Sequence, residues 1–571
     1  MAQAKRRTSR ARRATTPAKP AAPTPIAPPV GGRLWVLNVP FGARSIAAEH
    51  GARYDTARRS YVYAGTALPD GLLAFTPPLF SWEQWQQHVI NGEPQPSFDG
   101  DGSVTLRAHQ RTAVEAVVAA RASGRVGFLV ADETGLGKTY QAIAAVRQMQ
   151  AVEHVLVVCP LSVRATWRKS LQTFGTGDKR WCVQNIDGMR KLVDIPKSAA
   201  AAKKQKTKNK HIAEKGQPLE RWDIVIYDES AAYRNPSSQR STLARRLGAD
   251  AFRIWMSATA GQTPLELSYL APVLAQVTGR EVRDLEQFAG WCTEIGIAVT
   301  QGEYGRWEWE PNPADLTLMR QMLFEENPAG IRAGIRRRPT DIAGWPEQQR
   351  ISAPIELDPE ARQLYEELWT EFRRQMQLTA KGKDPAGMLA AITRFRQKAS
   401  LLRVDGVAGL IEELVDDGYR VAVSVSWLES MHQLGLDLNV GTIATMHGGQ
   451  TESEREQQRV LFQRGEADVI LFTPTEGFSL HASEDGADGR PRATVIHDVR
   501  WTAIESRQIE GRCHRAGERA DVYYTYAEDT IEEFVLRRAL QRVISMGEMQ
   551  GDDTSEVADM LAAINDLSLA P

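Results

Sequence analysis

The sequence predicts an α/β protein with two tandem lobes, each built on a parallel sheet flanked by helices. Three observations support this fold class. Strand-like apolar runs alternate with helical patterns from residue 106 to about residue 270, the alternation resumes from about residue 350 to residue 543, and about 80 residues separate the two blocks. Such alternation is typical of parallel sheets covered on both faces, because each crossover helix packs back onto its own sheet.

The apolar runs give the order of the expected strands. In the first block they are residues 126–130, 155–159, 224–227 and 252–256. In the second block they are residues 421–425, 442–445, 469–472, 494–497 and 522–526, and a helical pattern follows over 531–546. We therefore expect a first lobe over residues 100–275, a helical extension and inter-lobe linker over 276–350, a second lobe over 351–546, and a tail over 547–571.

Two further segments precede the first lobe. Residues 1–32 carry seven Lys or Arg, six Pro and no Asp or Glu, which is typical of a disordered basic arm, either solvated or attracted to phosphate. A small α+β module is expected over residues 33–78, where strand-like runs at 34–38 and 61–63 enclose a short helical stretch. Its Gly51-Ala52-Arg53-Tyr54-Asp55 resembles a pattern of a small domain of unknown function that accompanies phage and plasmid DNA-processing proteins.

Composition limits the class of protein and its partners. The chain has 571 residues, 42% of them hydrophobic and 25% charged, as in soluble globular proteins. Its net charge is −1, so any basic surface for nucleic acid must be local. No apolar run approaches the roughly 18 residues of a membrane span. The four cysteines (Cys159, Cys182, Cys292 and Cys513) are too widely spaced for a zinc site or a disulfide framework, which fits a reducing compartment.

A second lysine-rich stretch lies inside the first lobe. Residues 196–217 are rich in Lys and Ala, and we expect a flexible surface loop there. This loop is either solvated or in contact with a polyanion.

The stretch from Asp132 to Thr139 reads ADETGLGKT with the preceding alanine and predicts a phosphate cradle. It follows an apolar run and opens a helical pattern, so backbone N–H groups and a helix N-terminus face the anion. Lys138 would reach the β- and γ-phosphates, and Thr139 would bind Mg²⁺. Asp132 stands where the first glycine of the loop is usual, so the bare pattern is only partly met. The predicted nucleotide contacts of this loop are Thr134, Gly135, Leu136, Gly137, Lys138 and Thr139.

A pair of acids ends the apolar run at 224–227, about 90 residues after the phosphate loop. Phosphoryl transfer needs one carboxylate in the Mg²⁺ shell and another that orients or deprotonates water. We assign Asp228 to the metal, partly through water, and Glu229 to the water. ATP and Mg²⁺ are therefore the expected cofactors.

Three weaker features follow the order that a nucleic-acid-driven ATPase needs. Gln110 precedes the phosphate loop, where an amide could read the edge of adenine. Ser162 follows the next strand, with Trp167 nearby, and Ser257-Ala258-Thr259 follows the strand after the acidic pair. Ser and Thr at strand ends commonly just cap helices, so the order of the features carries the inference.

The second block supplies a candidate pair of arginine fingers. Arg512 and Arg515 share one face of a predicted helix at i,i+3 spacing. They are either surface arginines on a charged helix or cations that neutralise the transition state in the opposite lobe. A finger of that kind contributes roughly 10³–10⁵ in rate and engages only when the lobes close.

Together these motifs resemble the Swi/Snf-type branch of the superfamily-two helicases and translocases, over residues 106–544. The resemblance implies two tandem RecA-like lobes. It places Gln110 at the adenine-contacting glutamine, Asp228 and Glu229 in the DEAH box, and Gln508 with Arg512 and Arg515 in the finger motif. Gln508 is accordingly a predicted nucleotide contact. Ile335-Arg336-Arg337-Arg338 and Trp345-Pro346 are similar to the family's "LRR…LP" bridge between the lobes.

The resemblance implies an ATP-dependent motor that grips double-stranded DNA between its lobes and steps along it. The residues that it assigns to DNA contact or coupling are Ser162, Arg164, Ser257, Thr259, Arg336, Arg337, Thr475, Gly477, Ser479 and Trp501. The run at 336–338 could equally be a solvated basic face. We expect duplex DNA as the partner and a monomer, while the sequence is silent on protein partners.

Departures from the family pattern leave two alternatives open. Ala231 stands at the DEAH histidine, Thr502-Ala503 replaces Asn-Pro, and Glu518 replaces a glutamine. These changes are the support for a decayed DNA-binding scaffold, whereas the intact Lys138 and Glu229 argue for an enzyme. A strand-separating helicase acting on forks or RNA–DNA hybrids is the other alternative. The compact form is similar to bacterial or phage members, which predicts a cytoplasmic location, or a nuclear one if the source is eukaryotic.

Overall fold

The computed structural model describes residues 25–196, 200, 204–279, 285–301, 307–345, 348–381, 385–473, 478–482, 484, 486–500, 503–514 and 520–550. The chain divides into two compact units, Met1–Gln95 and Pro96–Pro571. Most of the predicted basic arm at 1–32 and of the tail at 547–571 lies outside these described ranges.

The first unit is a small α+β module. Its antiparallel sheet has the order β1-β3-β2, with β1 at Arg33–Leu37, β2 at Arg53–Asp55 and β3 at Ser60–Gly65. The helices are α1 (Arg44–Glu49), α2 (Asp70–Leu73) and α3 (Trp82–Asn91). The unit extends to Gln95, past the predicted end at residue 78, because α3 belongs to it: the Asn91 side chain bonds both the backbone N–H (3.1 Å) and the carbonyl (3.2 Å) of Leu34.

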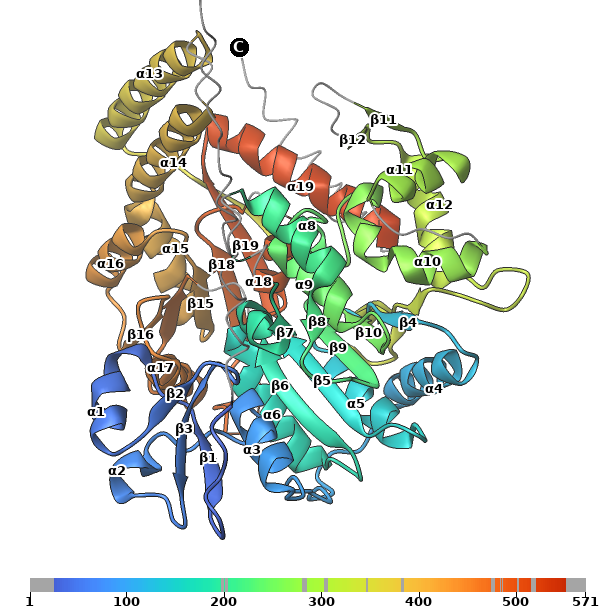
Figure 1. The fold of residues 1–571 in the computed structure, drawn as a ribbon. Coiled ribbons are helices and arrows are strands. Elements are labelled where there is room, and N and C mark those ends of the chain that lie inside the picture. Colours follow the sequence, from blue (N-terminus) through green and yellow to red (C-terminus); the bar gives the residue numbers. More distant parts are fainter. Residues whose placement is uncertain are drawn as a thin grey trace, which may run out of the picture. The chain divides into compact units, whose positions relative to one another are not determined.

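The first lobe of the second unit is built on a six-stranded sheet with the order β13-β4-β10-β9-β5-β6. Figure 1 labels β4, β10, β9, β5 and β6 of this sheet. Its neighbouring strands are all parallel. The strands are β4 (Gly127–Val130), β5 (His154–Cys159), β6 (Arg180–Asn185), β9 (Ile224–Asp228), β10 (Phe252–Met256) and β13 (Gly334–Ile335). The helices include α4 (Ala108–Ala122), α5 (Lys138–Gln148), α6 (Arg164–Phe174) and α9 (Gln239–Leu247).

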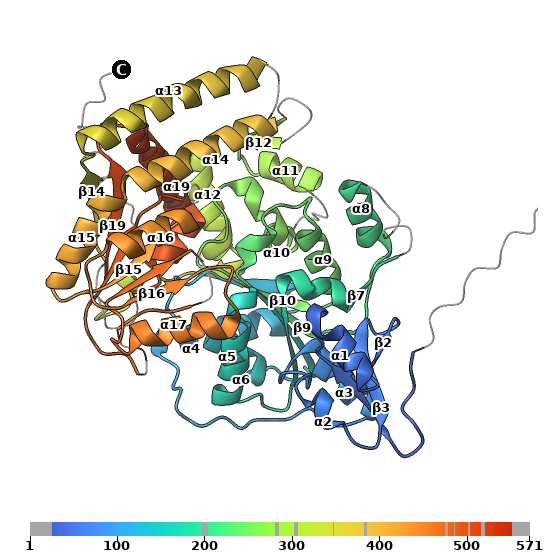
Figure 2. The same ribbon diagram turned by 90° about the vertical axis from the view of Figure 1, so that its left-hand side faces the viewer.

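The second lobe repeats this plan with a sheet in the order β14-β19-β18-β15-β17-β16, again parallel throughout. Its strands are β14 (Arg350–Ile355), β15 (Arg420–Ser424), β16 (Ile443–Met446), β17 (Val469–Phe472), β18 (Arg492–Ile496) and β19 (Ala520–Ala527). Its helices are α13 (Pro359–Lys381), α14 (Pro385–Leu402), α15 (Val404–Asp416), α16 (Leu428–Asp437), α17 (Glu452–Gln463), α18 (Ala503–Glu510) and α19 (Ile531–Gln550). Helices α13 and α14 lie side by side (Figure 2). The predicted fold class is confirmed.

The segment between the lobes combines helices with a hairpin, and it also returns to the first sheet. It contains α10 (Ala271–Thr278), α11 (Leu285–Glu294), the hairpin of β11 (Val299–Gln301) and β12 (Trp307–Trp309), and α12 (Pro313–Phe324). The short β13 then pairs with β4, the strand that leads into the phosphate loop. The linker is thereby fixed to the base of that loop.

The lysine-rich stretch at 196–217 is not the loop that we predicted. It contains helix α8 (Gln205–Lys215), which stands between β7 (Val193–Asp194) and β8 (Gln217–Pro218). Ile212 is fully buried, and the Asn209 side-chain amide donates to the Ser237 carbonyl at 2.7 Å. These two residues, three apart on one helix face, are enough to dock an otherwise lysine-rich helix beside α9.

Helices of the described ranges include none that is long and apolar enough to span a bilayer. The four cysteines are all buried thiols outside any disulfide. Within the same ranges, no group of three or more His, Cys, Asp and Glu side chains could hold a metal ion.

Candidate active site between the lobes

The phosphate loop joins β4 to α5. Gly135 and Gly137 have left-handed backbone angles (φ +94° and +83°), and Gly137 is the N-cap of α5. The left-handed backbone at Gly137 favours glycine, and a Cβ atom there would lie 2.1 Å from the Gln110 side-chain nitrogen, which would have to shift. Gln110 donates to the Leu136 carbonyl at 3.1 Å. The predicted adenine reader thus lies directly against the loop.

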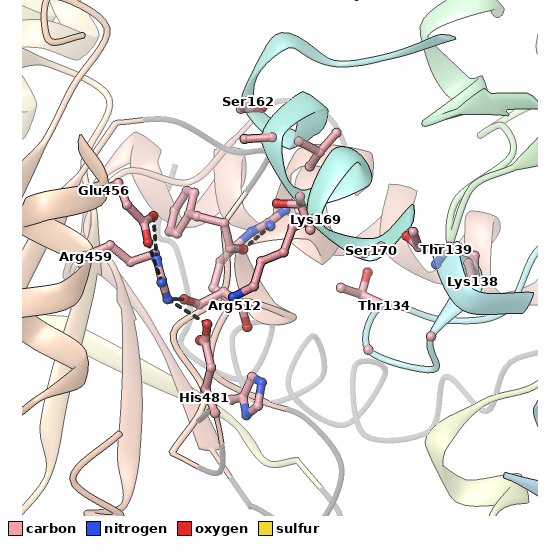
Figure 3. Close-up of a pocket in the computed structure, with 18 of the residues that line it drawn as sticks. Thr134, Lys138, Thr139, Ser162, Lys169, Ser170, Glu456, Arg459, His481 and Arg512 are labelled. Carbon is pink, nitrogen blue, oxygen red and sulfur yellow. Dashed lines mark hydrogen bonds and ion pairs between the residues drawn. The ribbon is translucent and has the colours of Figure 1, made fainter. Parts of the chain in front are cut away.

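Lys138 begins α5 and folds back over the loop. Its ammonium group donates to the carbonyl oxygens of Asp132 (2.7 Å) and Glu133 (3.2 Å). These are ordinary carbonyl contacts that a phosphate can replace. Lys138 and Thr139 line one cavity, which lies between the two lobes (Figure 3).

The departure at Asp132 has a structural explanation. Its carboxylate is fully buried and accepts hydrogen bonds from the Gln141 side chain (2.8 Å) and from the guanidinium of Arg337 (Nε at 2.9 Å, and Nη2). Arg337 also donates to the His109 carbonyl. A buried carboxylate is tolerated when it is paired and fully hydrogen-bonded. Asp132 therefore fixes the loop to the inter-lobe linker.

These contacts correct the prediction that Arg336 and Arg337 bind DNA. The Arg336 guanidinium donates to the carbonyls of Ala131 (2.7 Å) and Ala258 (2.8 Å) and pairs with Glu133 at 3.3 Å. Only 4% of the Arg336 side chain and 14% of the Arg337 side chain are exposed. Both cations compensate acceptors inside the lobe, so neither is available to a phosphate backbone.

The acidic pair stands at the end of β9. The Asp228 carboxylate accepts from the Trp167 indole at 2.7 Å and from the Glu229 backbone N–H at 3.0 Å. Burial raises the pKa of Asp228 to about 6, and the negative charge of Glu229 adds to the increase. Such a carboxylate is best satisfied by a nearby cation.

Glu229 adopts a left-handed backbone (φ 51°, ψ 56°) that is unusual for a residue other than glycine. Strained backbone of this kind clusters at functional sites. The side chain lines the cavity between the lobes and accepts a hydrogen bond from Gln508 of the second lobe at 3.2 Å. Gln508, predicted to contact the nucleotide, thus contacts the acid assigned to the water.

Ser257 and Thr259 form a small buried turn after β10. The Ser257 hydroxyl donates to the Thr259 carbonyl at 3.1 Å and accepts from the Thr259 N–H at 3.2 Å. Thr259 also lines a small pocket between the lobes with Arg507 and Gly511. Because both residues are buried, their position suits communication between lobes and not direct contact with DNA.

The second lobe brings Arg512 into the same cavity as the phosphate loop. Its guanidinium donates to the Phe478 carbonyl at 2.7 Å and lies 5.2 Å from the centre of the Phe478 ring. The adjacent Gly511 is in close contact with the loop, since a Cβ atom there would lie 2.9 Å from the Thr134 side chain. Arg515, Thr475, Gly477 and Trp501, which we also predicted as site residues, lie outside the described residues.

The cavity has a volume of about 1600 Å³. Ser162 and Ser479, two predicted DNA contacts, line it from opposite lobes; Arg164 is on α6 but is not among the lining residues. Sequence reasoning missed Lys169 on α6 and Arg459 on α17, which also line it. Arg459 is held by Glu456 (2.7 Å), as Figure 3 shows, and by Glu484 (2.8 Å). The spacing of Lys169 and Arg459 in the sequence does not indicate a role at the site. The sequence of α17, for example, has the pattern of an ordinary charged helix.

A second polar contact between the lobes lies beside the phosphate loop. Arg507 approaches Glu133 (4.0 Å) and Glu510 (3.6 Å), and Glu510 pairs with Arg350 at 3.0 Å. Burial alone would raise the pKa of Glu510, but Arg350 and Arg507 outweigh it and lower that pKa to about 2. This carboxylate is therefore ionised and anchors the linker strand β14 to the finger segment.

The arrangement of phosphate loop, acidic pair and cross-lobe arginine agrees with a match to a known family. The SNF2-related domain matches residues 109–400, which is half of the chain. The chain belongs to the SNF2-related family. It is 25% identical over 578 residues to a SWI/SNF-related matrix-associated actin-dependent regulator of chromatin subfamily A-like protein 1 homolog of Caenorhabditis elegans, covering 93% of this chain and 77% of that protein.

Two further relatives of this SNF2-related protein are longer. It is 23% identical to the Drosophila melanogaster subfamily A-like protein 1 (72% of this chain, 52% of the relative) and 22% identical to an uncharacterized ATP-dependent helicase of Mycoplasma pneumoniae (76% and 41%). Among solved structures, the Sulfolobus solfataricus SWI2/SNF2 ATPase core in complex with dsDNA matches with 16% identity and a TM-score of 0.32, covering 82% of this chain and 98% of that one. As a family member, the protein is a helicase-like, nucleic-acid-dependent ATP hydrolase.

Proposed function

We propose that the protein is a motor that moves along double-stranded DNA by ATP-driven closure of its two lobes. One observation carries the proposal: a single cavity is lined by the phosphate loop and acidic pair of the first lobe and by Arg512 of the second. A nucleotide in that cavity contacts both lobes at once. Binding and hydrolysis would then change how tightly the lobes close.

ATP would bind with its phosphates at the N-terminus of α5. The backbone N–H groups of the loop and the helix dipole favour the anion. Lys138 would leave the carbonyl groups of Asp132 and Glu133 and turn to the β- and γ-phosphates. Gln110, already against the loop, would read the edge of the base.

Thr139 and Asp228 fit the needs of a Mg²⁺ ion. Both line the nucleotide cavity, and a buried carboxylate whose pKa is raised by its surroundings gains from a divalent cation. When bound, Mg²⁺ would neutralise charge on the phosphate oxygens. Trp167 and the Glu229 N–H would hold the Asp228 carboxylate in place for this role.

Hydrolysis would depend on Glu229 and on cations from the second lobe. Glu229 would orient the attacking water and accept its proton, and Gln508 would hold the Glu229 carboxylate. Arg512 would move from the Phe478 carbonyl to the γ-phosphate as the lobes close. We also propose a finger role for Arg515. Charge neutralisation of this kind is the main catalytic resource in phosphoryl transfer.

The motor would hold DNA mainly through its phosphates. Phosphate contacts fix position without reading sequence, which a tracking motor requires. Ser162, Arg164 and Ser479 are the described candidates, and we propose Thr475, Gly477 and Trp501 with them. The resemblance of the motifs to Swi/Snf translocases favours duplex tracking over strand separation. The presence of Lys138, Asp228 and Glu229 together favours an active enzyme over a decayed scaffold.

Two assays on the full chain test this function. Duplex DNA should stimulate phosphate release from ATP, and the protein should displace the third strand of a triplex while leaving a forked duplex paired. Unwinding of the fork would favour the strand-separating alternative. A lack of stimulated phosphate release by any nucleic acid would contradict the enzyme itself.

A further inference from the structure

The inter-lobe linker places one aromatic side chain in the nucleotide cavity. Trp345 lies between β13 and β14 and lines the same cavity as Gln110, Lys138 and Thr139. Its backbone N–H donates to the Ile342 carbonyl at 3.1 Å, so the linker turns just before it. The Swi/Snf pattern has leucine at this place, and no role assigned so far uses the indole ring.

The surroundings of Trp345 identify the end of the cavity at which it lies. The Arg107 guanidinium is 5.7 Å from the centre of the Trp345 ring. Arg107 is the N-cap of α4, and its backbone N–H donates to the Gln110 side chain at 2.8 Å. Trp345 therefore stands at the Gln110 end of the cavity, beside the predicted adenine reader.

Two properties of this corner point to a planar, heteroaromatic ligand. The Trp345 indole N–H is buried and has no hydrogen-bond partner among the described residues, a property that it shares with Trp427; what sets Trp345 apart is its place in the nucleotide cavity. Arg107 is exposed, and within the same ranges no acidic side chain pairs with it. An aromatic face, an exposed guanidinium and an unused donor together suit a base with its sugar.

We propose that Trp345 is the stacking platform for the nucleobase of ATP, with Arg107 closing over the base and the indole N–H available to the sugar. This inference rests on the proposed function, because it needs ATP in the cleft. It adds a consequence for motion. Trp345 belongs to the connector between the lobes, so a bound base fixes that connector and links nucleotide occupancy to lobe position.

The decisive test separates the base from the phosphates. Calorimetry measures the Kd of ATP and of inorganic tripolyphosphate for the wild type and for Trp345→Ala, Trp345→Leu and Trp345→Phe. Loss of one stacked base contact corresponds to roughly 10-fold to 100-fold in Kd. We expect Trp345→Ala and Trp345→Leu to weaken ATP by that factor and to leave tripolyphosphate unchanged, while Trp345→Phe stays within a few-fold of the wild type.

Matched controls keep the outcomes distinct. Trp427→Ala changes a half-buried tryptophan at the N-cap of α16, outside the cavity, and should alter neither ligand. Equal ATP affinity in the wild type and Trp345→Leu would overturn the base platform. Equal loss of ATP and tripolyphosphate would overturn it as well, by indicating general damage. If the wild type bound neither ligand, the proposed function itself would fail.

Two further measurements distinguish a base platform from a purely structural role of Trp345: base selectivity, and protection of the linker from hydrogen exchange. A purely structural role would change neither. The preference for ATP over CTP in kcat/KM should fall in Trp345→Leu, because a purine offers more stacking area than a pyrimidine. ATP should slow hydrogen exchange of residues 339–345 in the wild type but not in Trp345→Leu. An unchanged preference together with unchanged protection would contradict the coupling.

Discussion

The two lobes hold their functional side chains in different ways. In the first lobe, Asp228 is fixed by Trp167, and Gln110 is fixed on the Leu136 carbonyl. In the second lobe, Arg512 is engaged by the Phe478 carbonyl and Arg459 by two glutamates, all within that lobe. Lys138 apart, whose ammonium group would leave two backbone carbonyls, the first lobe thus presents a preorganised cradle. The second lobe presents cations that must leave carboxylate or carbonyl partners before they can act.

This difference indicates which step of ATP hydrolysis each lobe should control. A preorganised cradle governs binding of the nucleotide and placement of the water. Cations that arrive only on closure stabilise the transition state and add little to ground-state binding. Changes in the second lobe should therefore alter turnover and leave nucleotide affinity largely intact.

The largest expected effect is on Arg512. We expect Arg512→Ala to lower duplex-stimulated kcat by about 10³-fold or more while leaving the Kd of ATP within a few-fold of the wild type. Arg512→Lys should recover only part of the rate, because it keeps the charge but loses the planar fork. Steady-state phosphate release and calorimetry measure the two quantities. A loss of ATP binding in Arg512→Ala would show that this residue contributes to ground-state binding of the nucleotide, and would contradict the proposed difference between the two lobes.

Glu229 is the corresponding test in the first lobe. Glu229→Gln keeps the shape and removes the base, so we expect kcat to fall by roughly 10²–10⁴. ATP should still bind, because the phosphate loop is untouched. Filter binding of labelled ATP beside a turnover assay checks this. Wild-type turnover would show that another group activates the water.

Because Arg336 and Arg337 are largely buried, we expect a change at Arg337 to lower the stability of the first lobe and to leave DNA binding unchanged. Arg337→Ala leaves the Asp132 carboxylate buried without its cation, which should cost about 3–5 kcal/mol in the free energy of unfolding of the first lobe. The matched change Arg338→Ala removes an exposed pair with Asp341 (2.8 Å) and should cost less than about 1 kcal/mol. Denaturant unfolding compares them. Equal stability of the two variants, with weaker DNA binding in Arg337→Ala, would restore the DNA-contact assignment.

The smallest expected effect concerns lysines of α8 in the first lobe and of its N-cap, Lys204. Changing Lys204, Lys208 and Lys215 to Gln should make the salt dependence of duplex binding shallower by about 2–3 units of log–log slope, if each lysine contacts one phosphate. Lys398→Gln on α14 of the second lobe is the control and should leave the slope unchanged. An unaltered slope in the triple variant would assign α8 to a solvated face.

Much of the fold follows from local patterns, and the failures have a common cause. The runs at 252–256 and 469–472 coincide with β10 and β17, because largely apolar runs of this length suit a strand buried on both faces. The two-residue strand β13 has no period to detect. Helix α8 depends on two anchoring residues among lysines, so its composition resembles that of a loop.

The site was predictable where its residues are close in sequence and hidden where partners are far apart. The phosphate loop and the acidic pair are local motifs. By contrast, other partners are far apart in the sequence and only the fold brings them together. Asp132 and Arg337 are 205 positions apart, and Trp167 and Asp228 are 61 positions apart. For the same reason, the run of arginines at 336–338 resembles a DNA-binding segment as long as the hydrogen-bond acceptors buried around it are unknown.

The most direct test of closure by the second lobe uses a transition-state mimic. ADP with aluminium fluoride and duplex DNA should form a tight, slowly dissociating complex with the wild type. Arg512→Ala should bind ADP normally but fail to trap the fluoride. Equal trapping by both proteins would show that Arg512 does not reach the transferred phosphoryl group, and would contradict the account.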